Sequence, residues 1–171
     1  ALPDPTRASQ AIYGELSEPN EVDLYAFTAE VDQEVPVEAL VPVRASLTDF
    51  RPWVAVWGAA MGASAVPQPL LSTVAPLALP AEARVLVSGA NETNGPRSVF
   101  FEPFSVENLY HGEEMTFTVR AGGTYYVAVY DPAHRTGAYS LGIGTAEDFS
   151  GTNFAKLLQT VVKIKLGVHA G

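Results

Sequence analysis

The chain has 171 residues, of which 47% are hydrophobic and 17% are charged, so it can build the core of one globular domain and is not a disordered chain. It contains no cysteine, which excludes a disulfide framework, cysteine-ligated metal centres and a thiol nucleophile. The net charge of −9 argues against nucleic acid as a partner.

The first residue is Ala1, and the opening sequence ALPDPT has neither a basic region nor an apolar stretch. A cleaved signal peptide leaves a start of this kind, and so does a shortened chain. Of the two, we expect the first. The protein is then extracytoplasmic (secreted, periplasmic or at the cell surface), with its signal peptide removed.

Nine segments before residue 145 have the composition of β-strands, and no convincing helix interrupts them. Residues 22–30 alternate with large apolar groups at odd and even positions, so we expect a strand partly buried on both faces. Pro36 and Pro42 suggest an edge position for the third strand. The nine segments are 10–16, 22–30, 35–43, 52–58, 83–89, 98–104, 114–121, 124–131 and 138–144. They predict an all-β, antiparallel two-sheet β-sandwich of jelly-roll or Greek-key type.

Residues 52–81 contain no charged side chain. A run of this length raises the question of a membrane span. Four prolines and two glycines interrupt it, however, and a spanning helix does not tolerate breaks at that density. We expect a strand, a proline-rich loop packed on the surface, and the start of another strand.

The C-terminal segment differs from the rest of the chain in charge. Residues 1–148 carry seven arginines against 19 acidic residues, a net charge of −12, whereas residues 149–171 carry three lysines and a net charge of +3. We therefore divide the chain into a sandwich domain, 1–144, and a basic amphipathic segment, 145–171. Helical spacing of apolar residues predicts a helix over about 153–166, although the β-branched run VVKIKLGV is compatible with an extended strand instead.

The basic C-terminal segment has three available roles. It can fold back on its own acidic sandwich, dock on a protein partner, or lie on an anionic membrane surface. The residues that we expect to make such a contact are Phe154, Lys156, Leu157, Leu158, Val161, Lys163 and Lys165.

Three stretches have the order and spacing of known motifs: YGEL with EVDLYAF (13–16 and 21–27), AGGTYYVAV (121–129) and TGAYSL (136–141). Through them the chain resembles the bacterial pre-peptidase C-terminal (PPC) domain family from residue 10 to residue 144. The resemblance implies a jelly-roll-like β-sandwich on an exported protein. It also implies an accessory role, often beside a peptidase or another secreted module, without catalytic activity. The long middle part, 59–114, and the segment after Gly144 depart from the family's pattern.

Two places are candidate metal sites. Collagen-binding domains similar to this family hold calcium near the first acidic turn, and the matching positions here are Asn20 and Asp23, with Glu21 beside them. Calcium prefers such oxygen ligands, although a solvated acidic turn has the same sequence. His111 lies in YHGEEM, which offers imidazole, carboxylate and thioether groups to a transition metal; an ordinary surface histidine is the alternative. The sequence establishes no cofactor, and calcium is the candidate that it suggests.

No catalytic pattern stands out. The sequence lacks G-x-S-x-G and H-E-x-x-H, so we expect no enzyme. Trp53 and Trp57 share one strand face, as do Tyr126 and Tyr130, and these rings either fill the core or form a carbohydrate or peptide platform.

We therefore expect a non-catalytic interaction module. Its sandwich is a rigid scaffold that presents the loops 59–82 and 89–98 together with the C-terminal docking segment. The alternative is a calcium- or carbohydrate-binding accessory domain of a secreted enzyme. A small stand-alone hydrolase is the third and least favoured reading.

Overall fold

The computed structural model describes residues 11–32, 34–58, 84–88, 97–102, 106–112, 115–143 and 162–166. Within these ranges the chain forms eleven β-strands and one short 3-10 helix, η2 (Ala45–Leu47). The strands are β1 (Ala11–Leu16), β2 (Val22–Ala29), β3 (Glu34–Pro42), β4 (Trp53–Gly58), β5 (Arg84–Ser88), β6 (Val99–Glu102), β7 (Glu107–Tyr110), β8 (Met115–Thr118), β9 (Gly123–Tyr130), β10 (Gly137–Ile143) and β11 (Val162–Leu166).

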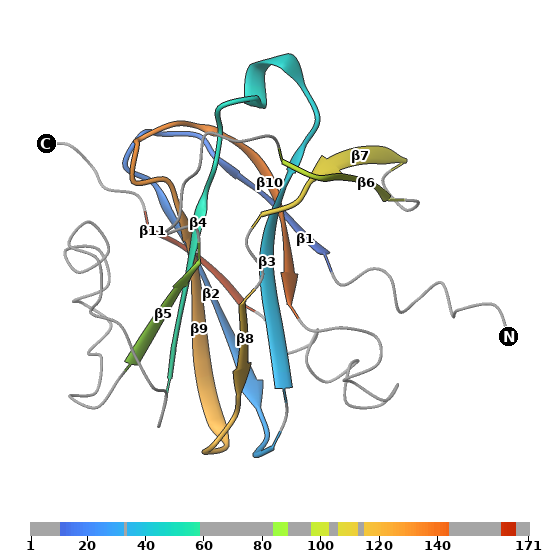
Figure 1. Ribbon diagram of the computed structural model, residues 1–171. Helices are drawn as coiled ribbons and strands as arrows, with labels where there is room; N and C mark the ends of the chain where they lie inside the picture. Colours follow the sequence, from blue (N-terminus) through green and yellow to red (C-terminus); the bar gives the residue numbers. More distant parts are fainter. Residues whose placement is uncertain are drawn as a thin grey trace, which may run out of the picture.

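The strands form two antiparallel sheets, which confirms the predicted β-sandwich (Figure 1). The first sheet has the order β1-β10-β3-β7-β6, with β8 also paired to β3, and the second has the order β11-β2-β9-β4-β5. Each of the first three connections crosses from one sheet to the other, as in jelly-roll-like folds. The predicted strands agree with the observed ones within a few residues.

The core lies between the sheets and follows the two-residue period of the strands. Phe27 of β2, Phe117 of β8 and Tyr125 of β9 stack there, with ring centroids 5.6–6.4 Å apart. All three side chains are almost fully buried. Aromatic packing of this kind joins the two inner faces.

The outer face of the second sheet is buried as well. Leu24 lies on the side of β2 that faces away from the core, and its exposed fraction is 0%. Across the sheet, Trp57 of β4 stacks on Tyr126 of β9 at 5.6 Å, and Ala128 is fully buried. The expectation that β2 is buried on both sides is therefore confirmed.

The edge position expected for the third strand is wrong. β3 lies in the interior of its sheet, with β10 on one side and with β7 and β8 on the other. The ladder with β10 covers only Val37 to Leu40, so Pro36 and Pro42 cost that ladder no hydrogen bond. On the other side of β3, Pro36 belongs to the ladder with β8 and Pro42 to the ladder with β7.

Part of the C-terminal segment belongs to the sandwich. Residues 162–166, within the range expected to be helical, form strand β11 on the edge of β2. The extended alternative is therefore correct for these five residues, because the β-branched Val162 and Ile164 favour pairing with an open strand edge. The remainder of the expected helix, 153–161, lies outside the described residues, as does most of the proline-rich run. No helix in the described ranges is both long and apolar enough to cross a membrane.

Candidate binding surface

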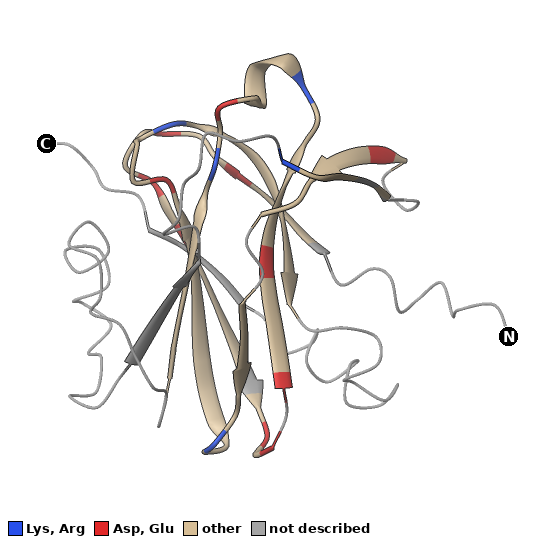
Figure 2. Ribbon diagram, in the orientation of Figure 1, with Lys and Arg blue, Asp and Glu red and all other residues tan. Residues whose placement is uncertain are grey.

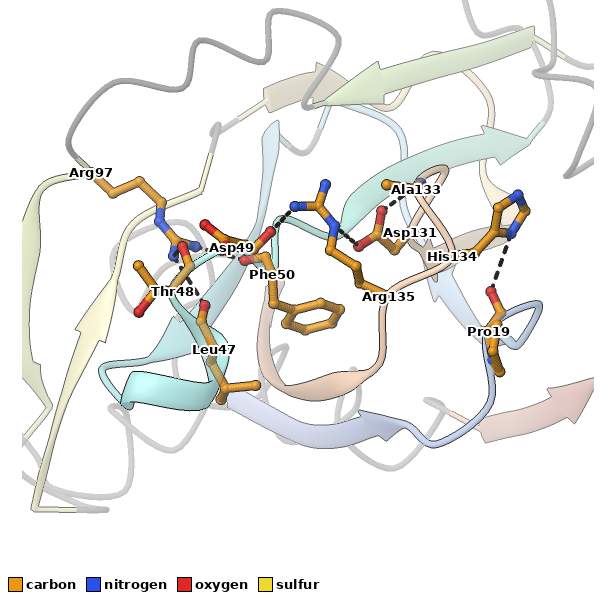
Figure 3. Close-up of polar contacts among 10 residues, drawn as sticks. All are labelled: Pro19, Leu47, Thr48, Asp49, Phe50, Arg97, Asp131, Ala133, His134 and Arg135. Carbon is orange, nitrogen blue, oxygen red and sulfur yellow. Dashed lines mark hydrogen bonds and ion pairs between the residues drawn. The ribbon is translucent and has the colours of Figure 1, made fainter.

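Two arginines hold the loop that contains η2 at one end of the sandwich (Figure 3). Arg97 donates hydrogen bonds to the carbonyl oxygens of Leu47, Thr48 and Phe50 at 3.2, 2.6 and 2.8 Å. Arg135 donates to the carbonyl oxygen of Asp49. Guanidinium groups thus donate to the carbonyl groups of the loop, one of which, that of Leu47, also accepts the Phe50 amide, and these hydrogen bonds fix the loop's conformation.

A second loop joins this network through Asp131, whose carboxylate is buried. It accepts hydrogen bonds from the Ala133 amide at 2.7 Å and from Arg135 Nε at 3.1 Å. His134, at φ 60°, places its Nδ1 3.3 Å from the carbonyl oxygen of Pro19. Three loops from different parts of the chain are therefore tied together. As Figure 2 shows, charged residues are sparse along the middle of the strands and frequent in the loops.

The hairpin of β6 and β7 stands out from this same end of the sandwich (Figure 1). Six large hydrophobic side chains are exposed among the described residues, and four of them belong to this hairpin or to the chain beside it. We call these four the hairpin patch: Val43 (39% exposed), Val99 (49%), Phe101 (56%) and Val106 (73%). A gathering of exposed apolar side chains is typical of an interaction site.

Register brings the hairpin patch onto one side of the sheet. Phe101 pairs with Asn108 across the hairpin, and Val43 donates its amide to the Asn108 carbonyl at 2.9 Å. Residues that lie opposite each other on paired strands share a face of the sheet, so Phe101 lies on the same face as Val43. Residues two apart on one strand also share a face, so Val99 lies on that face as well. Val106 sits in the turn at φ 52°, a conformation that is costly for a β-branched residue.

The base of the hairpin is rigid. The Arg97 guanidinium lies 4.1 Å from the ring centre of Tyr110 on β7, a cation–π contact. The same guanidinium holds the η2 loop, and burial lowers the pKa of Arg97 from its usual value. Arg44 pairs with Glu107 at 2.8 Å. The hairpin patch therefore projects from a fixed frame.

The residues proposed for calcium are placed differently from one another. Glu21 Oε2 accepts hydrogen bonds from the amides of Ser17 and Glu18, at 2.5 and 3.1 Å, and from the Ser17 hydroxyl at 2.9 Å. Asp23 faces the core with 0% exposure, whereas Asn20 is exposed on the turn. In the part of the chain that the structure describes, no group of three or more Asp, Glu or His side chains is arranged to hold a metal ion.

Asp23 belongs instead to a buried polar cluster between the sheets. Tyr139 of β10 donates its hydroxyl to Asp23 Oδ2 at 2.5 Å, and the hydroxyls of Tyr139 and Tyr25 are 2.5 Å apart. Burial, the largest cause, raises the pKa of Tyr25 to about 12 and raises the pKa of Tyr139 further. This Asp–Tyr–Tyr cluster links β2 to β10 and therefore one sheet to the other.

His111, the residue proposed for a transition metal, directly follows β7. Val41 of β3 pairs with Tyr110 of β7, and Val37 pairs with Met115 of β8, so His111 lies after the point where β7 leaves β3. Glu38 Oε1 lies 2.8 Å from His111 Nδ1 and accepts the Gly112 amide at 3.1 Å. The described contact of His111 is thus with a carboxylate of β3, which ties the end of β7 to that strand.

The other candidate residues have mixed outcomes. Lys163 and Lys165 lie on β11, whereas Phe154, Lys156, Leu157, Leu158 and Val161 lie outside the described residues. Of the aromatic platform, Trp57 and Tyr130 are buried at 1% and 2% exposure, although they lie on the outer face of the second sheet rather than in the core.

Sequence reasoning missed the hairpin patch. The stretch 98–104 was expected to be a strand, and the signal in it was Val99 and Phe101 at alternate positions. The exposure of these two residues depends on how β6 pairs with β7, a strand that the sequence pattern does not predict. No family model matches the sequence, and a search of curated proteins finds no match. The resemblance to PPC domains therefore remains a prediction.

Proposed function

We propose that the protein is a non-catalytic interaction module that binds a protein partner through the hairpin patch. One observation carries this proposal: four of the six exposed large hydrophobic side chains in the described ranges gather on the β6–β7 hairpin and beside it. Exposing them to water costs free energy unless a partner covers them. In keeping with its resemblance to PPC domains, we further propose that the module acts outside the cytoplasm.

The backbone of the hairpin supports a specific mode of binding. β6 is the last strand of its sheet, so its outer edge pairs with none of the described strands. An edge strand accepts an added strand from another chain, with backbone hydrogen bonds supplying affinity and alternate side chains supplying specificity. Val99 and Phe101 occupy those alternate positions.

The strained turn residue Val106 also supports a binding site at the hairpin. Val106 combines a φ of 52° with 73% exposure. A β-branched residue in this conformation costs on the order of 1–3 kcal/mol, and strain of this kind clusters at functional sites. Glycine would relieve the strain but would remove the apolar contact.

Charge indicates what kind of partner fits. The chain carries a net charge of −9, and the residues from 1 to 148 carry a net charge of −12. A second copy of the chain would bring like charges together. We therefore propose a partner that presents an extended segment with alternating apolar residues and with lysine or arginine nearby.

A peptide library tests this proposal. The full chain is immobilised and a phage-displayed library of random peptides is selected against it, followed by binding to Phe101→Ser and to a matched variant, Tyr13→Ser. Tyr13 is equally exposed, at 59%, but lies on β1 at the opposite edge of the same sheet.

We expect the selected peptides to carry alternating apolar residues together with basic residues. They should bind Tyr13→Ser as tightly as the unaltered chain. Their affinity for Phe101→Ser should be at least about tenfold lower, as expected for loss of a buried aromatic anchor. The Val106→Gly variant should bind the same peptides more weakly, and its melting temperature should be higher than that of the unaltered chain. Peptides that bind both serine variants equally well would overturn the proposal.

A further inference from the structure

The hydrogen-bond pattern of the β6–β7 hairpin determines which backbone groups of β6 face its outer edge. His111 donates its amide to the Ser98 carbonyl oxygen at 2.9 Å, and these two residues lie opposite each other, one step beyond the Val99–Tyr110 pair. Hydrogen-bonded and non-hydrogen-bonded positions alternate along an antiparallel pair. Val99 and Phe101 therefore occupy non-hydrogen-bonded positions toward β7, and their amide and carbonyl groups point to the outer edge.

The contacts on the other side of β7 agree with this assignment. The Asn108 carbonyl oxygen accepts the Val43 amide at 2.9 Å, so it points away from β6. Asn108 is the residue that pairs with Phe101 across the hairpin. The outer edge of β6 pairs with none of the described strands. It therefore offers a second chain the N–H donors and C=O acceptors of Val99 and Phe101.

The same two residues carry exposed side chains on the core-facing side of the sheet. Val99 pairs with Tyr110, and Tyr110 pairs with Val41, so all three lie on one face. Val41 is 2% exposed and belongs to the core, and Tyr110 packs against that core. Val99 and Phe101 are 49% and 56% exposed. The hairpin therefore continues the core-facing side of the sheet as an apolar surface that is open to water.

Taking the hairpin patch as the binding site, as in the proposed function, we propose that the partner segment pairs antiparallel with β6 and places two apolar residues directly opposite Val99 and Phe101. Each of these apolar residues then exchanges a pair of backbone hydrogen bonds with the β6 residue opposite it, and its side chain covers the exposed side chain there. The ligand thus has the form apolar–any residue–apolar, and both apolar residues carry a free backbone N–H.

Antiparallel pairing fits this short edge better than parallel pairing does. In the antiparallel arrangement, all the hydrogen bonds to Val99 and Phe101 fall within three consecutive residues of the partner. In a parallel arrangement, each β6 residue bonds the residues before and after the one beside it, so the same bonds spread over five residues. Ordering a longer segment costs more conformational entropy. The antiparallel arrangement therefore gives the same hydrogen bonds at a lower ordering cost.

Single N-methylation of a selected peptide tests this inference, because it removes one backbone N–H at a time and leaves the protein unaltered. The peptide is one from the library whose affinity falls with Phe101→Ser, and binding is measured by isothermal titration calorimetry. We expect affinity to fall at least about tenfold when either apolar residue is methylated, since a hydrogen bond is lost and its acceptor is left unpaired. Methylation of the residue between them is the matched control and should change affinity less than about threefold, because its N–H points away from β6.

The other outcomes separate this inference from the proposed function. Loss of affinity at the intervening residue, with tolerance at the apolar ones, would show parallel pairing. Equal tolerance at all positions would show binding through side chains alone. Either result would overturn the inference and leave the proposed function standing, because the peptide was chosen for its dependence on Phe101. A library that yields no peptide dependent on Phe101 would overturn both.

Paramagnetic broadening of amide signals measures the direction of the strand independently. The C-terminal end of an antiparallel peptide lies beside Ser98, and its N-terminal end lies beside Glu102. A nitroxide at the peptide's C-terminus should therefore broaden the Ser98 amide signal more than the Glu102 signal, and a nitroxide at its N-terminus should do the reverse. The opposite assignment of the two ends would overturn the inference.

Discussion

Replacing Tyr139 with phenylalanine tests the importance of the buried Asp–Tyr–Tyr cluster. The side chain is 1% exposed, and its ring packs in the core between β10 and β2. Phenylalanine keeps this ring and removes only the hydroxyl. The substitution therefore deletes the hydrogen bond to Asp23 Oδ2 and the contact with the Tyr25 hydroxyl, both at 2.5 Å, without leaving a large cavity.

The size of the effect follows from these two contacts. A hydrogen bond to a carboxylate contributes about 1.5–3 kcal/mol, and one between neutral hydroxyls contributes about 0.5–1.5 kcal/mol. Buried partners that lose their donor also lose its compensation for lost hydration. We expect the free energy of unfolding to fall by about 2–4 kcal/mol, and the melting temperature by on the order of 10 °C for a domain of this size.

Urea unfolding followed by circular dichroism measures this change, with Tyr13→Phe as the control. Tyr13 is 59% exposed, so its substitution should shift the free energy by less than about 0.5 kcal/mol. The slope of free energy against urea should stay the same in both variants. If Tyr139→Phe is as stable as Tyr13→Phe, the cluster does not hold the two sheets together.

Three further predictions follow from the described contacts. Because burial raises the pKa of Tyr25 to about 12 and also raises that of Tyr139, the fold retains protons that the unfolded chain loses near pH 10. Stability should be constant below that pH and should then fall by up to about 1.4 kcal/mol per pH unit per tyrosine, as alkaline unfolding curves would show. Arg97→Met should remove the guanidinium donor from three loop carbonyls, of which only that of Leu47 keeps a backbone donor, and should speed proteolysis within the η2 loop, whereas an unchanged cleavage pattern would mean that the loop is held by other contacts. Gly112→Ala should destabilise the protein by more than about 2 kcal/mol, because a Cβ there would lie 2.2 Å from a β3 carbonyl oxygen. Gly122→Ala, for which the nearest carbonyl oxygen is 3.7 Å away, should change stability little, and similar thermal shifts in the two variants would contradict the close approach of Gly112 to β3.

Most of the fold could be predicted from the sequence, because alternation along a strand is a local signal. β9 is an example, since GTYYVAVY combines high β-propensity with a preceding glycine turn. β7 was missed because its four residues, ENLY, have little alternation to detect. Residues 162–166 were left open between the end of a helix and an extended strand, because their β-branched residues follow a stretch with helical spacing, and the pairing with β2 is a tertiary contact that the sequence does not show.

The site was harder to predict, because burial of a polar residue depends on distant partners. Asp23 was considered as a calcium ligand or as part of a solvated acidic turn, yet it is buried, and its hydrogen-bond donor is Tyr139, 116 residues away in sequence. Pro36 and Pro42 indicated an edge strand, yet β3 lies in the interior of its sheet, where both prolines fall outside its ladder with β10 and each pairs with a residue of β8 or β7 on the other side. In both cases the local pattern has two readings, and the tertiary structure selects one of them.

The central claim is that a partner adds a strand to β6, and hydrogen–deuterium exchange tests it most directly. The full chain would be measured with and without a peptide selected from the library. The account predicts slower amide exchange in β6 (Val99–Glu102) when the peptide is present, and unchanged exchange in β1 (Ala11–Leu16), at the opposite edge of that sheet. Unchanged exchange in β6, or protection that appears only in β1, would contradict it.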